Sequence, residues 1–129
     1  MNGNRTLAAG SLLAAAAVGF GAFGAHGLKE TLEANGEQYV AAWDTAAQYH
    51  LVAALAIMVC GLAAPRFQCK GAVIAAWMLG VGSVLFSGSL YALAVTKISK
   101  LGMITPLGGL SLILGFVALG WTSFTCSEK

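Results

Sequence analysis

The stretch Gly71–Thr96 reads GAVIAAWMLGVGSVLFSGSLYALAVT and contains no charged residue. Three further stretches share this property: Thr6–Leu28, Thr45–Pro65 and Leu101–Ser127. An α-helix needs about 20 apolar residues to cross a bilayer, and each of the four stretches is at least that long. A water-soluble core does not require charge to be excluded over such regular lengths. The pattern therefore predicts a membrane protein with four spanning helices.

The composition supports this prediction. Hydrophobic residues make up 58% of the 129 residues and charged residues only 9%, whereas a soluble domain has about 25% charged residues. The net charge of +2 is too small and too scattered to indicate nucleic-acid binding. The predicted spans cover about residues 6–25, 43–64, 71–95 and 105–125. They leave no room for a soluble domain, so we expect a single integral membrane domain over residues 1–129.

The connection between the first two spans is the longest. It runs from His26 to about Ala42 and alternates charged residues with apolar ones. This pattern favours a short helix at the membrane interface, with Gly36 as its break. The predicted fold class is therefore all-α: a four-transmembrane-helix bundle with a short interfacial helix between helices 1 and 2.

Two prolines mark helix boundaries. Pro65 disfavours helical geometry in the residue before it, so the second span should end near Ala64. Thr105 and Pro106 form a typical start signal, with threonine as the N-cap and proline at the first helical position.

The distribution of basic residues gives a weak prediction of orientation. Four spans place both termini and the Pro65–Lys70 loop on one side, with Arg5, Arg66, Lys70 and Lys129, against Lys29, Lys97 and Lys100 on the other. The excess of one favours cytoplasmic termini. Cys69 and Cys126 would then face the reducing compartment and should be free thiols. The three cysteines have no metal-type spacing, and Cys60 is interpreted as a packing residue.

Small residues recur at three- and four-residue spacing along the predicted spans. Such residues let helix backbones approach closely within a membrane, where water does not drive helices together. The predicted helix-packing residues are Gly10, Ala14, Ala17, Gly21 and Gly24 on the first span, Gly80 and Ser83 on the third, and Gly108 and Gly115 on the fourth.

Polar residues are expected to gather at the end of the bundle that carries the first and third connections. Polar groups inside a membrane are costly, which makes them candidates for a functional site. The candidate ligand-binding residues are His26, Asp44, Gln48, His50, Ser87, Tyr91, Lys97, Lys100 and Thr105.

These residues allow more than one interpretation. They could serve structure alone, with Asp44 and Gln48 tying the start of the second span. They could instead bind a ligand, such as an anionic headgroup at the N-terminus of the fourth span near Lys97 and Lys100. A catalytic site is the weakest option, because no nucleophile, base and orienting group occur together. The two histidines have neither the helical phase nor the depth for haem ligation, so no catalytic residue, metal or cofactor is expected.

Three motifs occur in order along the chain: GAFGAHGL at 21–28, LFSGSLYALA at 85–94 and ITPLGG at 104–109. In these motifs the chain resembles the YgdD/YwdK-type small membrane proteins, a domain-of-unknown-function family with bacterial and eukaryotic members. The resemblance implies a four-helix integral membrane protein without an established activity. One position departs from the family pattern, because Ala53 stands where a histidine is usual and His50 lies nearby instead. The two positions differ in direction by about 60° on a helix, which argues against a strict two-histidine mechanism.

The sequence predicts a non-enzymatic accessory or scaffold protein of the bacterial inner membrane. Its expected partners are membrane lipids, a membrane-protein partner or further copies of itself, and not nucleic acid. The alternative is an oligomeric small transporter or channel, with Asp44, Gln48, Ser87 and Tyr91 facing the route. An intramembrane enzyme is the third option.

Overall fold

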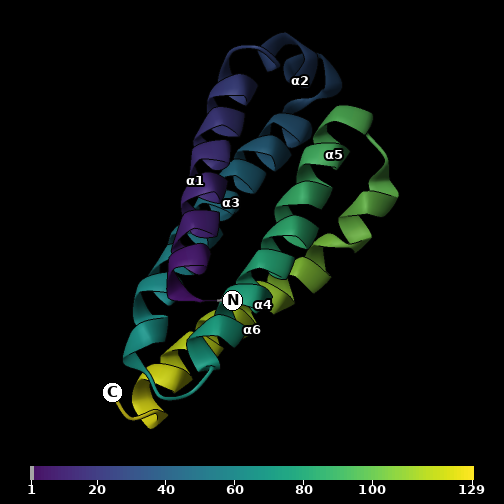
Figure 1. Ribbon diagram of the computed structural model, residues 1–129. Coiled ribbons are helices and arrows are strands. Elements are labelled where there is room, and N and C mark those ends of the chain that lie inside the picture. Colours follow the sequence, from purple (N-terminus) through teal and green to yellow (C-terminus); the bar gives the residue numbers. More distant parts are fainter. Residues whose placement is uncertain (1) are drawn as a thin grey trace.

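The long apolar stretches form long helices. The computed structural model describes residues 2–129. Within that range, four helices are long and apolar enough to span a membrane (Figure 1). The all-α, four-span prediction is confirmed. The spans are α1 (Gly3–Ala25), α3 (Glu37–Ala63), the combined helix α4 (Gly71–Ser83), η2 (Val84–Gly88) and α5 (Ser89–Thr96), and α6 (Thr105–Thr125).

The predicted short helix between the first two spans is present as α2 (Lys29–Asn35), which lies across one end of the bundle (Figure 1). Gly36 separates α2 from α3 and has a φ of 133°. Glycine adopts this backbone conformation without steric cost. α3 begins at Glu37, earlier than the predicted start near residue 43. Its additional first turns are stabilised by packing, because Tyr39 and Val40 lie against a cluster formed by Leu32, Trp43 and Ala94.

Of the two helix boundaries predicted from proline, the one at Pro65 agrees with the structure and the one at Pro106 differs in its N-cap. α3 ends at Ala63 and continues into the 3₁₀ turn η1 (Ala64–Arg66), which contains Pro65, as expected. At α6 the expected N-cap was wrong: Ile104 occupies the cap position and Thr105 is the first helical residue. The Thr105 hydroxyl lies 2.6 Å from Oγ of Ser89 and so contacts α5 instead of capping its own helix. The 3₁₀ turn η3 (Ser99–Met103) connects these two helices.

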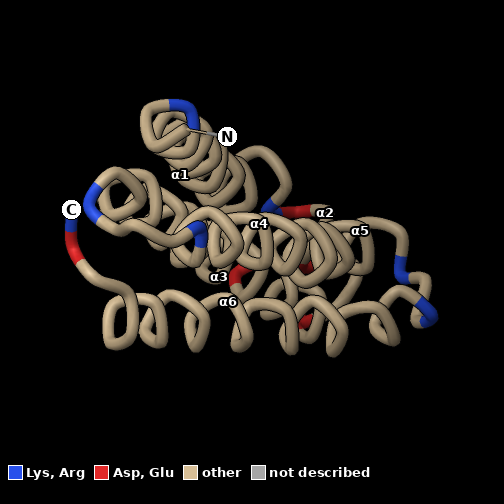
Figure 2. The backbone as a smooth tube through the Cα atoms, turned by 60° about the horizontal axis from the view of Figure 1, so that its bottom comes forward, with Lys and Arg blue, Asp and Glu red and all other residues tan. Residues whose placement is uncertain are grey.

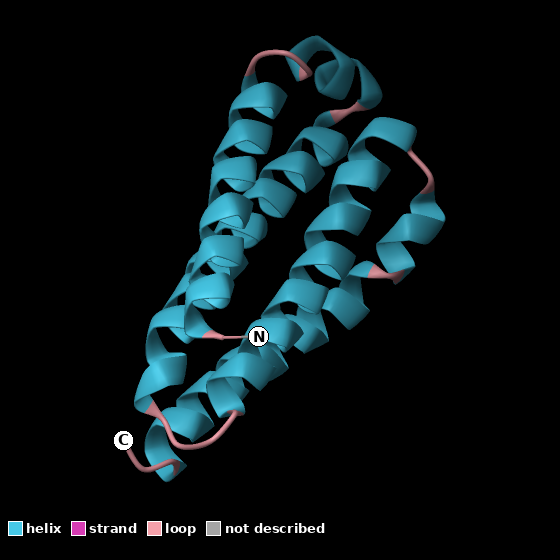
Figure 3. Ribbon diagram, in the orientation of Figure 1, coloured by secondary structure: helices cyan, strands magenta, loops and turns pink. Residues whose placement is uncertain are grey.

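The bundle consists of two helical hairpins. α1 runs antiparallel along α3, with α2 in the connection between them, and α6 runs antiparallel along the combined α4–η2–α5 helix, with η3 in that connection (Figure 3). α3 and the third span are the most buried, whereas α1 and α6 lie on the flanks. Lysines and arginines lie near the termini and in the connections, and long uncharged runs separate them (Figure 2). The main core consists mostly of small residues: Ala53, Ala56, Ile57, Cys60, Ala75, Ala76, Leu79 and Leu112.

Several predicted packing residues lie at close helix crossings. A Cβ at Gly10 would lie 2.7 Å from the backbone nitrogen of Met58, so α1 approaches α3 closely there. Gly108 faces the backbone at Phe86, and Ala17 and Ser83 are buried. Gly21 and Gly80 have more room, because their added Cβ atoms would meet one side-chain atom each, at 3.9 and 4.0 Å. A further close crossing, not predicted from the sequence, occurs at Gly61, which faces α1 at Leu7.

The expectation of free thiols at Cys69 and Cys126 is wrong. The two residues form a disulfide that joins the α3–α4 connection to the segment after α6. They are separated by 57 residues, and such a spacing contains no local signal for pairing. The expectation rested on a charge excess of a single residue. Cys60, in contrast, is a buried thiol within the core of α3.

Candidate functional site: an uncharged groove in the spanning region

His50 of α3 and Tyr91 of α5 meet inside the bundle. The Tyr91 hydroxyl lies 3.1 Å from Nδ1 of His50, within hydrogen-bonding distance. The imidazole is 7% exposed and therefore largely shielded from the surroundings. Because Nδ1 makes this contact, Nε2 remains available as a donor or an acceptor, depending on the tautomer. Both residues were predicted site candidates, but helical phase alone did not predict that they contact each other.

Aromatic rings from two other helices pack against Tyr91. Its ring centroid lies 4.6 Å from that of Trp43 on α3 and 5.0 Å from that of Phe20 on α1. Both separations fall in the range of favourable aromatic contacts. The indole nitrogen of Trp43 donates to the backbone carbonyl of Phe20 at 2.9 Å. The rings of Trp43 and Phe20 and the imidazole of His50 together fix the position of the Tyr91 side chain.

A groove of about 230 Å³ runs beside this cluster, between α1 and the third span. Its rim is exposed at Phe20 and Val84, so it opens on the outer surface of the bundle. No lysine, arginine, aspartate or glutamate lines it. The groove is therefore an uncharged depression whose exposed lining is mostly apolar, with its polar side chains largely buried. It is lined by Leu13, Phe20, His50, Ser83, Val84, Ser87, Gly88 and Tyr91.

Ser87 lies at the base of this groove, within the π-helical turn η2. The side chain is 2% exposed, and its hydroxyl has no hydrogen-bond partner among residues 2–129. Several other helical hydroxyls bond the carbonyl four residues earlier, as Thr96 and Thr122 do at 2.6 and 2.7 Å. A buried hydroxyl without a partner costs free energy, and π-helical turns occur frequently at functional sites. Ser87 is thus a polar group with unused hydrogen-bonding capacity beside a groove.

The other candidate residues do not join this cluster. His26, Asp44, Gln48, Lys97 and Lys100 are all exposed. Asp44 and Gln48 lie beyond the start of α3, which begins at Glu37, so they do not cap it. Ser89 and Thr105 form a separate hydroxyl pair between α5 and α6. Of the candidate residues, only His50, Tyr91 and Ser87 come together, and they do so near the middle of α3 and not at the end of the bundle.

Ser83 was predicted to be a packing residue and Phe20 was not a predicted site residue, yet both line the groove. A signal for Ser83 was present, because Ser83, Ser87 and Tyr91 recur every four residues along one face. Phe20 gave no such signal, since its contribution depends on where α1 lies against the third span. In the described part of the chain, no three histidine, cysteine, aspartate or glutamate residues are placed to hold a metal ion.

The fold defines a class: a multi-pass helical membrane protein of four spans. Residues 20–109 match the family model described as "Protein of unknown function (DUF423)", and the chain belongs to this family. It is 45% identical over 111 residues to UPF0382 membrane protein YwdK of Bacillus subtilis, covering 85% of this chain and 88% of that protein.

Two further relatives extend this comparison. A UPF0382 membrane protein of Staphylococcus epidermidis is 43% identical, with 85% of this chain and 87% of the relative covered. A UPF0382 membrane protein of Haemophilus influenzae is 37% identical, with 83% of each chain covered. No solved structure matches the chain significantly.

Proposed function

We propose that this protein is a non-enzymatic accessory protein of the bacterial inner membrane that binds a lipid in the groove between α1 and the third span. The observation that carries the proposal is the unpartnered hydroxyl of Ser87 at the base of a groove that opens toward the lipid phase. The hydroxyl is buried beneath the groove lining, so a bound molecule that supplies an acceptor would satisfy it once neighbouring side chains shift to expose it. Water does not readily reach it inside a bilayer.

The lining of the groove favours an uncharged headgroup. His50, Ser83, Ser87 and Tyr91 supply hydroxyls and an imidazole, and the lining contains no cation to pair with a phosphate. Moving a charged headgroup to this position would carry a large desolvation cost without an ion pair to offset it. A carbonyl group accepts hydrogen bonds from hydroxyls at no such cost. The ligand we expect is therefore an uncharged lipid with a carbonyl group, either a diacylglycerol or an isoprenoid quinone.

Glycine substitutions offer a matched test. Gly88 lines the groove, and an added Cβ there would meet no other atom within 4 Å. The backbone at Gly88 thus has open space for a side chain, and we expect Gly88→Leu to obstruct the groove. Gly120 on α6 is equally unobstructed but does not line the groove, which makes Gly120→Leu the control. Both leucines would add the same apolar surface to a spanning helix.

The measurement is native mass spectrometry of the full chain in nanodiscs of phosphatidylglycerol, to which diacylglycerol or decylubiquinone is added in separate samples. We expect one of these two lipids to remain bound to the wild type and to Gly120→Leu, but not to Gly88→Leu. Ser87→Ala should retain less. Retention of phosphatidylglycerol alone, or equal retention by both leucine variants, would contradict the proposal.

An oligomeric transporter remains the alternative. Asp44 and Gln48 are exposed on the outer surface of α3, so they could line a route only between copies of the chain. Solute flux in liposomes that is abolished by Asp44→Asn and unaffected by Gly88→Leu would favour transport over lipid binding.

A further inference from the structure

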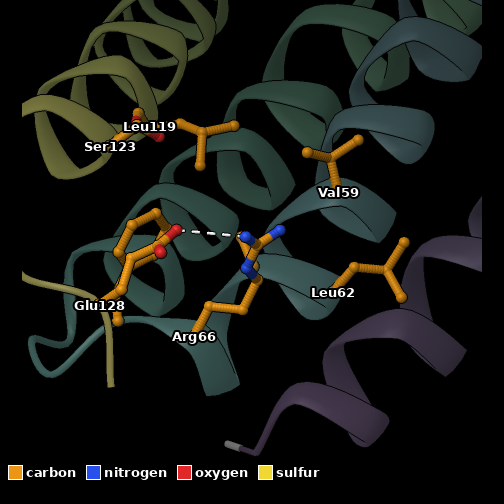
Figure 4. Close-up of a pocket in the computed structure, with 8 residues that line it drawn as sticks. Val59, Leu62, Arg66, Leu119, Ser123 and Glu128 are labelled. Carbon is orange, nitrogen blue, oxygen red and sulfur yellow. Dashed lines mark hydrogen bonds and ion pairs between the residues drawn. The ribbon is translucent and has the colours of Figure 1, made fainter.

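The end of the bundle that carries both termini is held together by several contacts. The Cys69–Cys126 disulfide connects the α3–α4 connection to the segment after α6. Beside it, Nη2 of Arg66 lies 3.1 Å from Oε1 of Glu128 (Figure 4). The backbone nitrogen of Lys129 donates to the carbonyl of Arg66 at 2.8 Å, and that of Gln68 donates to Ser127 at 3.2 Å. The C-terminal segment is therefore fixed in place next to the cysteine pair.

We infer that Cys69 and Cys126 form an oxidised modification site on the exoplasmic side of the membrane, so that both termini face outward. This inference rests on the disulfide and is independent of the lipid groove. Disulfides persist in oxidising compartments, whereas glutathione and thioredoxin keep cytosolic thiols reduced. The bundle brings the two cysteines together in either orientation, but the bond persists in only one of them.

The chemistry of the site specifies its co-reactant. A thiolate of one cysteine attacks the disulfide of an exoplasmic thiol oxidase and forms a mixed disulfide with it. The second cysteine then attacks this intermediate and closes the Cys69–Cys126 bond. The two cysteines together release two protons and transfer two electrons, and the oxidase disulfide becomes a dithiol. The chain is thus a substrate of the exoplasmic thiol-oxidising machinery.

The charge distribution opposes this orientation only weakly. The termini end carries Arg5, Arg66, Lys70 and Lys129, and the opposite end carries Lys29, Lys97 and Lys100, an excess of one residue. The bias of basic residues toward the cytoplasm is statistical. A covalent bond that the cytosol would reduce is the stronger indicator. On this orientation α2 and η3 face the cytoplasm.

Thiol counting tests the oxidation state and the side together. Intact cells that express the full chain are quenched with acid, denatured, and treated with a polyethylene-glycol maleimide that adds a visible mass to each free thiol. With three cysteines in the chain, we expect one label, on Cys60, without reduction. Treatment of the intact cells with a membrane-impermeant phosphine reductant should raise this to three. Cys69→Ser, which leaves Cys126 unpaired, should give two labels without reduction and calibrates the count.

Each of the other results overturns the inference. Three labels without reduction would show that the pair is not oxidised. One label that rises only with a membrane-permeant reductant would place the disulfide on the cytoplasmic side. A C-terminal fusion to alkaline phosphatase, which is active only when exported, gives an independent readout of orientation. We expect activity from this fusion and no fluorescence from the matching fusion to green fluorescent protein.

Discussion

The hydroxyl of Tyr91 lies 3.1 Å from Nδ1 of His50, and this contact links the third span to α3 in the spanning region. The two residues lie 41 positions apart in the chain, so the contact forms only when the two hairpins pack together. It therefore reports on the assembled bundle and not on either hairpin alone.

Tyr91→Phe should separate the contribution of this hydrogen bond from that of the ring. The phenylalanine keeps the aromatic contacts with Phe20 and Trp43 but loses the hydroxyl. Hydrogen bonds between membrane helices are worth about 0.6 kcal/mol on average, so we expect a small loss of stability. Thermal unfolding in detergent measures it. A loss as large as that of Tyr91→Ala would show that the hydroxyl, not the ring, dominates.

Gly24→Ala should destabilise the protein more than Gly21→Ala. A Cβ at Gly24 would overlap the indole of Trp43, which also donates to the carbonyl of Phe20. Overpacking of this kind costs about 1–3 kcal/mol. The control position is on the same helix, because a Cβ at Gly21 would meet only Ala47, at 3.9 Å. Comparison of their unfolding midpoints checks the prediction, and equal midpoints would contradict it.

Cys126→Ser should lower stability without preventing assembly. The disulfide closes a loop across a separation of 57 residues, and a native disulfide contributes about 2–4 kcal/mol by restricting the unfolded chain. The unfolding midpoint of the variant should match that of the reduced wild type. An unchanged midpoint after reduction of the wild type would mean that the remaining contacts at this end are sufficient.

His26→Ala should leave both the fold and lipid retention unchanged. The imidazole is exposed at the end of α1 and lies outside the groove. Surface substitutions of this kind usually change stability by no more than about 0.5 kcal/mol. Circular dichroism and native mass spectrometry together test this expectation. Loss of a bound lipid in this variant would move the candidate site toward the α1–α2 connection.

Much of the fold was predictable from the sequence, because the membrane imposes a simple rule on composition and length. The uncharged stretches gave the spans, Pro65 gave the end of α3, and Gly36 gave the break after α2. Each of these features depends on a residue type acting locally. The predicted start of the second span was less accurate, because Tyr39 and Val40 extend α3 through packing with distant residues.

The candidate site was predictable only in part. His50, Ser87 and Tyr91 were predicted as candidates because polar residues are costly within a spanning helix. The π-helical turn at Val84–Gly88 was not predicted. Such a turn is a local change in backbone hydrogen bonding, and the amino-acid composition does not indicate it. The groove depends on how α1 lies against the third span, and the disulfide depends on two distant segments meeting. Neither is encoded in a local pattern.

The disulfide also changes the connectivity of the molecule. It converts residues 69–126, which include the whole second hairpin, into a closed covalent ring. The first hairpin is attached to that ring at a single point, next to Cys69. A protease cut at the exposed Lys97 or Lys100 would open the ring without dividing the molecule, and the two fragments would separate only after reduction.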